Sequence, residues 1–186
     1  MSSSKPTDDA ARALALLTRV TRHRVRSRAE AHALLSRHGF SPTVCHQVIA
    51  RCDTEGLLDD VLCAKLVATS WADRGYAWGA IRMKLSAKGI GDTTIAQMES
   101  LLGGARTDVA RADQVAKMFQ ERARRMPLSD VRRETNRLAR RLAARGFDAE
   151  LIEQVLKSFS KPDGWLWQTR SHSLRAQLRS PEGEHV

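Results

Sequence analysis

Three stretches of the chain share one pattern: residues 35–40 read LSRHGF, residues 85–90 read LSAKGI and residues 142–147 read LAARGF. Each has a leucine four residues before a glycine, a cationic or imidazole side chain directly before the glycine, and Phe or Ile directly after it. This pattern is typical of a helix that ends at a left-handed glycine, with the cation at the negative end of the helix dipole. The glycines are 50 and 57 residues apart, so the sequence predicts a unit of about fifty residues that occurs three times.

Each repeat is expected to contain three helices. Ser27 and Glu30 have the spacing of a capping box at the start of a helix. Ser41, Asp92 and Asp148 stand where the N-cap of the helix after each glycine is expected. We predict helices over 9–22, 28–38, 42–55, 59–74, 78–88, 93–102, 107–125, 130–145 and 149–159.

The composition also predicts an all-α fold. Ala, Arg and Leu are strong helix formers and are the commonest residues, whereas nine residues are aromatic. We therefore expect an elongated array of three tandem three-helix repeats. The predicted divisions are a flexible N-terminal tail over 1–8, repeats over 9–55, 56–103 and 104–159, and a flexible C-terminal tail over 160–186.

The charge balance predicts an anionic partner. Lys and Arg number 31 against 21 Asp and Glu, a net charge of +10, and such a surface attracts polyanions or an acidic protein face. Cys45, Cys52 and Cys63 form no CxxC pair, so we expect buried cysteines and neither a disulfide framework nor a metal site. The chain has no signal-peptide core and no long apolar run, so we expect a cytoplasmic protein that does not bind a membrane. We also expect a monomer without a cofactor.

Sequence motifs of known catalytic chemistry are missing. The chain has no glycine-rich phosphate-binding loop, no HExxH zinc motif and no GxSxG nucleophile motif. The sequence therefore predicts a binding protein rather than an enzyme.

Cationic side chains recur on the second predicted helix of two repeats. The helix over 130–145 has four arginines at positions i, i+4, i+7 and i+8, which places them on one face. Such a face is either simply solvated or a contact site for phosphate or acidic protein, and like charges at this spacing slightly destabilise an isolated helix. The candidate contact residues on the two helices are Arg82, Lys84, Lys88, Arg133, Arg137, Arg140 and Arg141.

Two further groups are weaker candidates. Five arginines and no acidic residue lie between positions 19 and 28, and Arg24 and Arg26 belong to this group. Asp59 and Asp60 precede the first helix of the second repeat, where capping of that helix explains at least one of them.

The middle repeat resembles the RecX family of recombinase regulators, and weaker matches lie in the other two. The motifs are GLLDD at 56–60, RGY at 74–76, IRMKLSAKGI at 81–90, the S-x-x-E of 27–30 and RGF at 145–147. The resemblance covers about residues 12–158. The chain departs from the family at Val61 and Leu62, where a charged pair is usual, and at Ala77 and Trp78, where Gly and Pro are usual.

The resemblance implies a protein without catalytic activity that binds the RecA protein and the RecA filament on single-stranded DNA. It further implies inhibition of ATP hydrolysis, filament extension and strand exchange, in DNA repair, homologous recombination and the SOS response, with at most weak binding to DNA alone. The residues by themselves leave an alternative, a tandem-helical protein that acts directly on DNA. That alternative predicts tight binding to naked DNA with a steep salt dependence.

Overall fold

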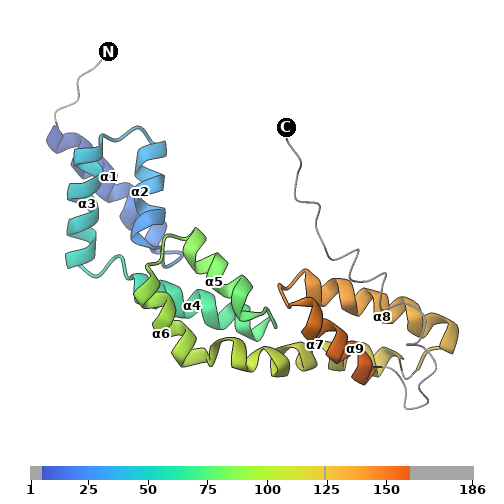
Figure 1. Ribbon diagram of the computed structural model, residues 1–186. Helices are drawn as coiled ribbons and strands as arrows, with labels where there is room; N and C mark the ends of the chain where they lie inside the picture. The colour runs from blue at the N-terminus through green and yellow to red at the C-terminus, as the bar shows by residue number, and fades with distance from the viewer. Residues whose placement is uncertain (1–5, 124, 160–186) are drawn as a thin grey trace, which may run out of the picture. The chain divides into compact units, whose positions relative to one another are not determined.

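The computed structural model describes residues 6–123 and 125–159, and within these ranges the protein consists of helices without a strand (Figure 1). The elements are α1 (Pro6–Thr21), α2 (Arg28–Arg37), α3 (Pro42–Thr54), α4 (Asp60–Asp73), α5 (Trp78–Ala87), α6 (Asp92–Leu102), the short 3₁₀ helix η1 (Gly104–Thr107), α7 (Asp108–Ala123), α8 (Leu128–Ala143) and α9 (Ala149–Phe159). The all-α prediction is confirmed, and every predicted helix lies within three residues of its expected bounds.

The first helix begins earlier than predicted. Residues 6–8 were expected in the N-terminal tail, but α1 already begins at Pro6. Proline fits the first turn of a helix because its φ is already helical and the missing N–H has no partner there. Asp8 and Asp9 in the same turn stabilise the helix, because their negative charges lie at the positive end of its dipole. The rest of the two predicted tails, 1–5 and 160–186, lies outside the described residues.

The three repeated glycines end their helices as predicted. Gly39, Gly89 and Gly146 have φ values of 80°, 70° and 82°, the left-handed region that side chains with a Cβ avoid. In all three cases the residue after the glycine donates its N–H to the carbonyl of the repeated leucine, over 3.3, 3.1 and 3.3 Å. This is the Schellman ending, which folds the following Phe or Ile back against the helix.

Most of the predicted N-caps are confirmed. Ser27 and Glu30 form the complete capping box of α2, and Ser41 accepts the N–H of Val44 at the start of α3. Asp148 caps α9 in the same way, over 2.7 Å. The prediction for Asp92 is wrong by one residue, because α6 already begins there and Gly91 precedes it. Glycine is itself a favourable N-cap residue.

Contacts divide the chain into two compact units. Among the described residues, the first comprises 6–70 together with Ile81–Leu102, and the second comprises Trp71–Ala80 together with 103–123 and 125–159. The division into three repeats at 9–55, 56–103 and 104–159 stays a prediction.

In the first unit, α1, α2 and α3 pack around an apolar core (Figure 1). Leu17 from α1, Leu35 from α2, and Cys45 and Cys52 from α3 are completely buried there. Cys63, on α4, is also buried and unpaired. The expectation of buried cysteines is therefore confirmed, and they fill the interior as small apolar side chains.

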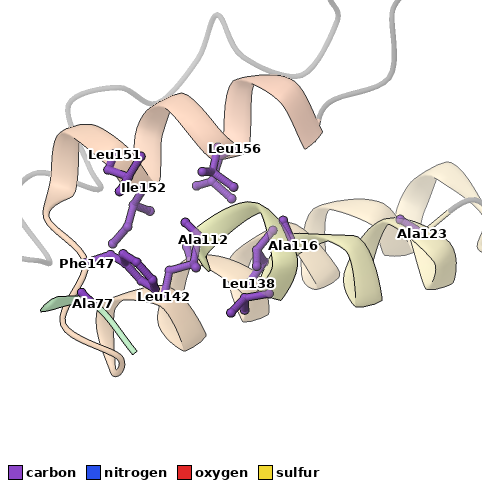
Figure 2. Packing of buried hydrophobic residues seen from close by; sticks show 13 residues of the cluster. Ala77, Ala112, Ala116, Ala123, Leu138, Leu142, Phe147, Leu151, Ile152 and Leu156 are labelled. Atoms are coloured by element: carbon purple, nitrogen blue, oxygen red, sulfur yellow. The ribbon is translucent and has the colours of Figure 1, made fainter. Parts of the chain in front are cut away.

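In the second unit, α7, α8 and α9 pack against one another (Figure 2). Ala112 from α7, Leu138 and Leu142 from α8, and Leu156 from α9 meet in its core, and Phe147 covers the end of α8. Burial of each large apolar side chain stabilises the unit by about 1.5–3 kcal/mol. This core determines which side of α8 faces inward.

Alanine substitutions at two of the glycines should separate backbone strain from steric overlap. A Cβ at Gly39 would have no neighbour within 4 Å, whereas a Cβ at Gly89 would overlap the methyl group of Ala29. We expect Gly39→Ala to lower the free energy of unfolding by about 1 kcal/mol and Gly89→Ala by about 2–3 kcal/mol. Urea unfolding followed by circular dichroism measures both losses. Equal losses would contradict the close packing at Gly89.

Candidate partner-binding surface

α8 has an apolar face on one side and a cationic face on the other. Val131, Leu138 and Leu142 are buried in the second unit, and residues three or four positions apart share a side of a helix. The remaining side of α8 therefore faces solvent. Its exposed arginines are Arg132, Arg133, Arg137, Arg140 and Arg141, which we call the α8 arginine face. The four predicted positions are all exposed, and Arg132 joins them.

Arg137 is tied to the fold by a buried acid. Its guanidinium lies 3.2 Å from a carboxylate oxygen of Glu134, whose side chain is 2% exposed. Removing the arginine would leave a buried carboxylate without its counter-charge, which is costly. Arg137 therefore stabilises the second unit in addition to contributing charge to its surface.

The other members of the α8 arginine face carry charge that the fold does not need. Arg133 lies 3.8 Å from Asp130, and both side chains are open to solvent, so this pair contributes at most about 1 kcal/mol. Among the described residues, no acidic side chain pairs with Arg132, Arg140 or Arg141, although Nε of Arg140 donates to the carbonyl oxygen of Asn136 over 3.3 Å. Arginine side chains of this kind can form two parallel hydrogen bonds to a carboxylate or a phosphate.

Arg145 adds a cation that was not among the candidates. Its guanidinium lies 5.7 Å from the centroid of the Tyr76 ring, and this ring packs on Trp71 with 4.3 Å between the ring centroids. Burial lowers the pKa of Arg145, and the nearby charge of Arg141 lowers it further. The signal in the sequence was its place before a repeated glycine, where it corresponds to Lys88.

The three candidates of the second repeat have different surroundings. Arg82 and Lys84 on α5 are exposed, on either side of Met83, whose surface is 75% exposed. Lys88 is only 13% exposed, and its Nζ lies 2.6 Å from Oε1 of Glu30. Lys88 therefore has a structural partner. Arg82 and Lys84 are exposed on the surface of the first unit.

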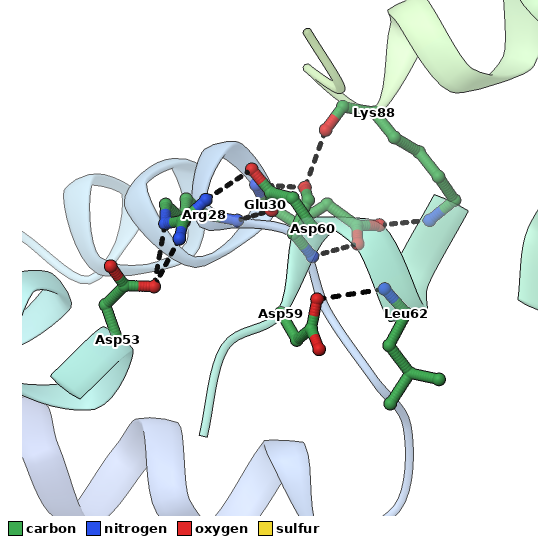
Figure 3. Close-up of polar contacts among 8 residues, drawn as sticks. Arg28, Glu30, Asp53, Asp59, Asp60, Leu62 and Lys88 are labelled. Carbon is green, nitrogen blue, oxygen red and sulfur yellow. Dashed lines mark hydrogen bonds and ion pairs between the residues drawn. The ribbon is translucent and has the colours of Figure 1, made fainter. Parts of the chain in front are cut away.

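The capping box of α2 binds Lys88 through two groups (Figure 3). The Ser27 hydroxyl donates to the carbonyl oxygen of Lys88 over 2.6 Å, while the Lys88 ammonium donates to Glu30. Burial alone would raise the pKa of Glu30, but the hydrogen bonds from Lys88 and from the Ser27 backbone N–H outweigh it and leave that pKa below its usual value. These contacts join residues that are 61 and 58 positions apart in sequence.

Asp59 and Asp60 both have structural partners (Figure 3). Asp59 accepts the N–H of Leu62 over 2.9 Å, which confirms that capping explains one of the pair. Asp60 accepts the backbone N–H of Arg28 over 2.8 Å and binds its guanidinium over 3.1 Å. A hydrogen bond to Asp53 raises the pKa of the Arg28 guanidinium above its ordinary value. We call the contacts among Ser27, Arg28, Glu30, Asp60 and Lys88 the first joint.

The second unit contains a joint of the same design. The Ala77 N–H donates to the carbonyl oxygen of Arg145 over 3.0 Å, and the Trp78 N–H donates to Asp108, the first residue of α7, over 2.9 Å. These four residues occupy the repeat positions of Ser27, Lys88, Arg28 and Asp60. In this second joint the cation stacks on Tyr76 instead of pairing with an acid, because alanine replaces Glu30 at the equivalent position.

The arginines before α2 have mixed surroundings. Arg24 donates to Glu30 over 2.6 Å and is still 57% exposed. Arg26 is half-buried, and its Nε has no hydrogen-bond partner in the described part of the chain. The structure thus brings Arg24 and Lys88 together at one carboxylate, although they are far apart in sequence.

Cys52 and Cys63 are poor nucleophiles. Burial raises the pKa of the Cys52 and Cys63 thiols, which keeps them protonated near neutral pH. In the described ranges, no group of three or more His, Cys, Asp or Glu side chains is arranged to hold a metal ion. No helix described by the structure is both long enough and apolar enough to span a membrane.

The substitution Glu30→Gln should show how much the first joint contributes to the free energy of unfolding. The pKa of Glu30 is lower in the folded chain than in the unfolded one, so its carboxylate stabilises the fold above the unfolded value near about 4.3. This stabilisation is lost as the pH falls through the folded pKa. We expect the substitution to lower the free energy of unfolding by about 1–2 kcal/mol at pH 7, and the difference from the unmodified chain to shrink below about pH 4. Urea unfolding at both pH values measures it.

Glu55→Gln is the matched control, because Glu55 pairs with Arg51 and both side chains are well exposed. We expect it to change the free energy of unfolding by less than about 0.5 kcal/mol at either pH. A difference for Glu30→Gln that grew on acidification would contradict the role assigned to that carboxylate.

Searches among known proteins find several relatives, each named regulatory protein RecX. The protein from Mycobacterium avium is 32% identical over 158 residues, which cover 83% of this chain and 88% of the relative. The Mycobacterium tuberculosis protein is 30% identical over 159 residues with the same coverage. The Pectobacterium atrosepticum protein is 36% identical over 112 residues, 60% of this chain and 65% of the relative. No family model matches the chain.

Two crystal structures have a similar fold. RecX from Lactobacillus salivarius matches with a TM-score of 0.63 and 18% identity, over 82% of this chain and 97% of that one. A second structure, of regulatory protein RecX, matches with a TM-score of 0.61 and 19% identity, over 82% and 73% of the two chains. These two structures share the fold of this chain. The relative that is 32% identical and covered over 88% of its length shows that the chain belongs to the RecX family of regulatory proteins.

Proposed function

We propose that this chain is a non-enzymatic regulator that binds the RecA recombinase and its filament on single-stranded DNA. Binding inhibits ATP hydrolysis, filament extension and strand exchange in DNA repair and recombination. Membership of the RecX family supports this proposal, as do the motifs by which the sequence resembles that family.

The observation that carries the proposal is the α8 arginine face. Five exposed arginines lie on one helix of 16 residues, and each pair of like charges one turn apart destabilises a helix by about 0.2–0.5 kcal/mol. The apolar core of the second unit explains why α8 is amphipathic, but it does not explain why the outer face is arginine. An anionic partner, either an acidic protein surface or a DNA backbone within the filament, does explain it.

Inhibition requires that the protein distinguish between states of its partner. A ligand shifts a polymer between active and inactive states only if it binds one of them more tightly. We propose that the repeats contact neighbouring RecA subunits and favour a filament state that neither grows nor hydrolyses ATP. Arg82 and Lys84 on α5 are proposed as further contacts, because both are exposed on the first unit.

Direct action on DNA is the alternative function, since the α8 arginine face also suits phosphates. It predicts tight binding to naked DNA, weakening steeply with salt. Regulation through RecA predicts inhibition at ratios well below one molecule per RecA subunit, without saturation of the DNA.

Charge reversal on the α8 arginine face should abolish most of the inhibition. The variant Arg133→Glu, Arg140→Glu, Arg141→Glu leaves the buried Arg137–Glu134 pair intact. We expect the concentration for half-inhibition of DNA-dependent ATP hydrolysis by RecA to rise about tenfold or more, since each lost or reversed charge contact weakens binding several-fold. Binding to a naked single strand, measured in parallel, separates the two functions.

The matched control is Lys65→Glu, Arg106→Glu, Lys117→Glu, which makes the same change of net charge at exposed positions on α4, η1 and α7. It should inhibit nearly as well as the unmodified chain. If both variants lost inhibition equally, overall charge would be responsible and the assignment to α8 would be wrong. If inhibition appeared only once the DNA was saturated, the direct DNA-binding function would replace the proposal.

A further inference from the structure

The contacts described above leave a groove between α1 and α3 unused. Its volume is about 820 Å³, within the range of about 300–1,000 Å³ that is usual for binding sites. Six of its lining residues come from α1, Arg22 directly follows that helix, three come from α3, and none of the ten is acidic. The groove lies within the first unit, and its role does not depend on the α8 arginine face.

The floor of the groove is aliphatic and shallow. Leu14 from α1 and Val48 from α3 form part of it, and both belong to or pack against the core of the first unit. Ala11 and Ala15 lie one turn apart on α1 and are exposed along the groove. Because their side chains are small, the backbone of an incoming helix can come close to α1.

The positive charge of the groove is concentrated at one end. Arg19 and Arg22 come from the end of α1 and the residue after it, and Arg51 comes from α3. Arg51 already donates to Glu55 over 2.7 Å. In the ranges that the structure describes, no acidic side chain pairs with Arg19 or Arg22, although both are exposed. This end therefore offers two cations that the fold leaves without a counter-charge.

We infer that this groove binds an amphipathic helix of a partner protein, with acidic residues in the first two turns of that helix. Ala10 and Arg22 are twelve residues apart, about 18 Å along a helix, or roughly three turns of an occupant. Acidic residues are favourable at a helix N-terminus. With its N-terminus at Arg22, the occupant runs antiparallel to α1, and its apolar residues at i, i+4, i+7 and i+11 lie on the aliphatic floor.

A nucleic-acid strand fits the groove less well. The lining contains no aromatic side chain on which a base could stack. Arg19 and Arg22 also lie together at the end of α1, whereas a phosphate backbone of similar length needs cations along its whole path. The mixed lining, aliphatic over most of its length and cationic at one end, matches an acidic amphipathic helix.

The test uses the full chain and a fluorescent synthetic helix of about 15 residues, with leucines at i, i+4, i+7 and i+11 and glutamates in its first two turns. Fluorescence anisotropy should show saturable binding. The variant Arg19→Glu, Arg22→Glu should weaken it about tenfold or more, and Ala15→Trp, which fills the groove, should weaken it similarly. Arg37→Glu on α2, an exposed arginine outside the groove, should bind within about twofold of the unmodified chain. A peptide with Gln in place of every Glu should bind several-fold more weakly.

Each alternative outcome overturns the inference. Absence of saturable binding, equal binding of the Glu and Gln peptides, or an equal loss for Arg37→Glu would exclude a charge-selective groove. If a single-stranded oligonucleotide bound more tightly than the acidic peptide and lost binding in the Arg19→Glu, Arg22→Glu variant, the groove would be a nucleic-acid site. Circular dichroism confirms folding. If Ala15→Trp failed to fold, the double arginine variant at exposed positions would still decide the question.

Discussion

The contact between Glu30 and Lys88 joins two helices that lie 58 residues apart in sequence, and the surrounding residues of the first unit depend on it. Ser27 is completely buried because its hydroxyl binds the Lys88 carbonyl. Gly89 must lack a Cβ because Ala29 occupies that space. Asp60 satisfies the first N–H of α2 and the guanidinium of Arg28 at the same place. Two ion pairs, one hydroxyl and one glycine thus fix how these segments meet.

The second joint keeps the contact positions of this design and changes the donor and the side chains. In both joints a donor at the start of the second helix of one repeat, Ser27 or Ala77, binds a backbone carbonyl of the following repeat. That carbonyl belongs to the residue before the repeated glycine, Lys88 or Arg145. The first joint adds a carboxylate, so its strength varies with pH and salt. The second adds the stacking of Arg145 on Tyr76, which does not depend on the titration of an acid. The two joints therefore share their contact positions and the backbone carbonyl that accepts, while the donor and the cation's partner differ.

Positive charge in this protein serves two purposes. Lys88, Arg28 and Arg137 neutralise acids that the fold brings inside or nearly inside. Arg140 and Arg141, by contrast, have no acid to neutralise in the described part of the chain, and neither do Arg19 and Arg22. The net charge of +10 therefore does not show which cations neutralise acids within the fold and which stay available for a partner. The proposed contacts with RecA and with an acidic helix rest on the second group alone.

The sequence by itself determined the helices, most of their caps and the three glycine endings, because these depend on side chains only a few residues apart. It also placed four arginines on one face of α8, since helical spacing alone sets that face. It did not show that Lys88 and Arg82, two cations on the same short segment, have different roles. Only the tertiary structure decided that Lys88 lies beside Glu30 and Asp60 beside Arg28. Such contacts depend on the packing of helices far apart in sequence, and the same packing also creates the groove between α1 and α3.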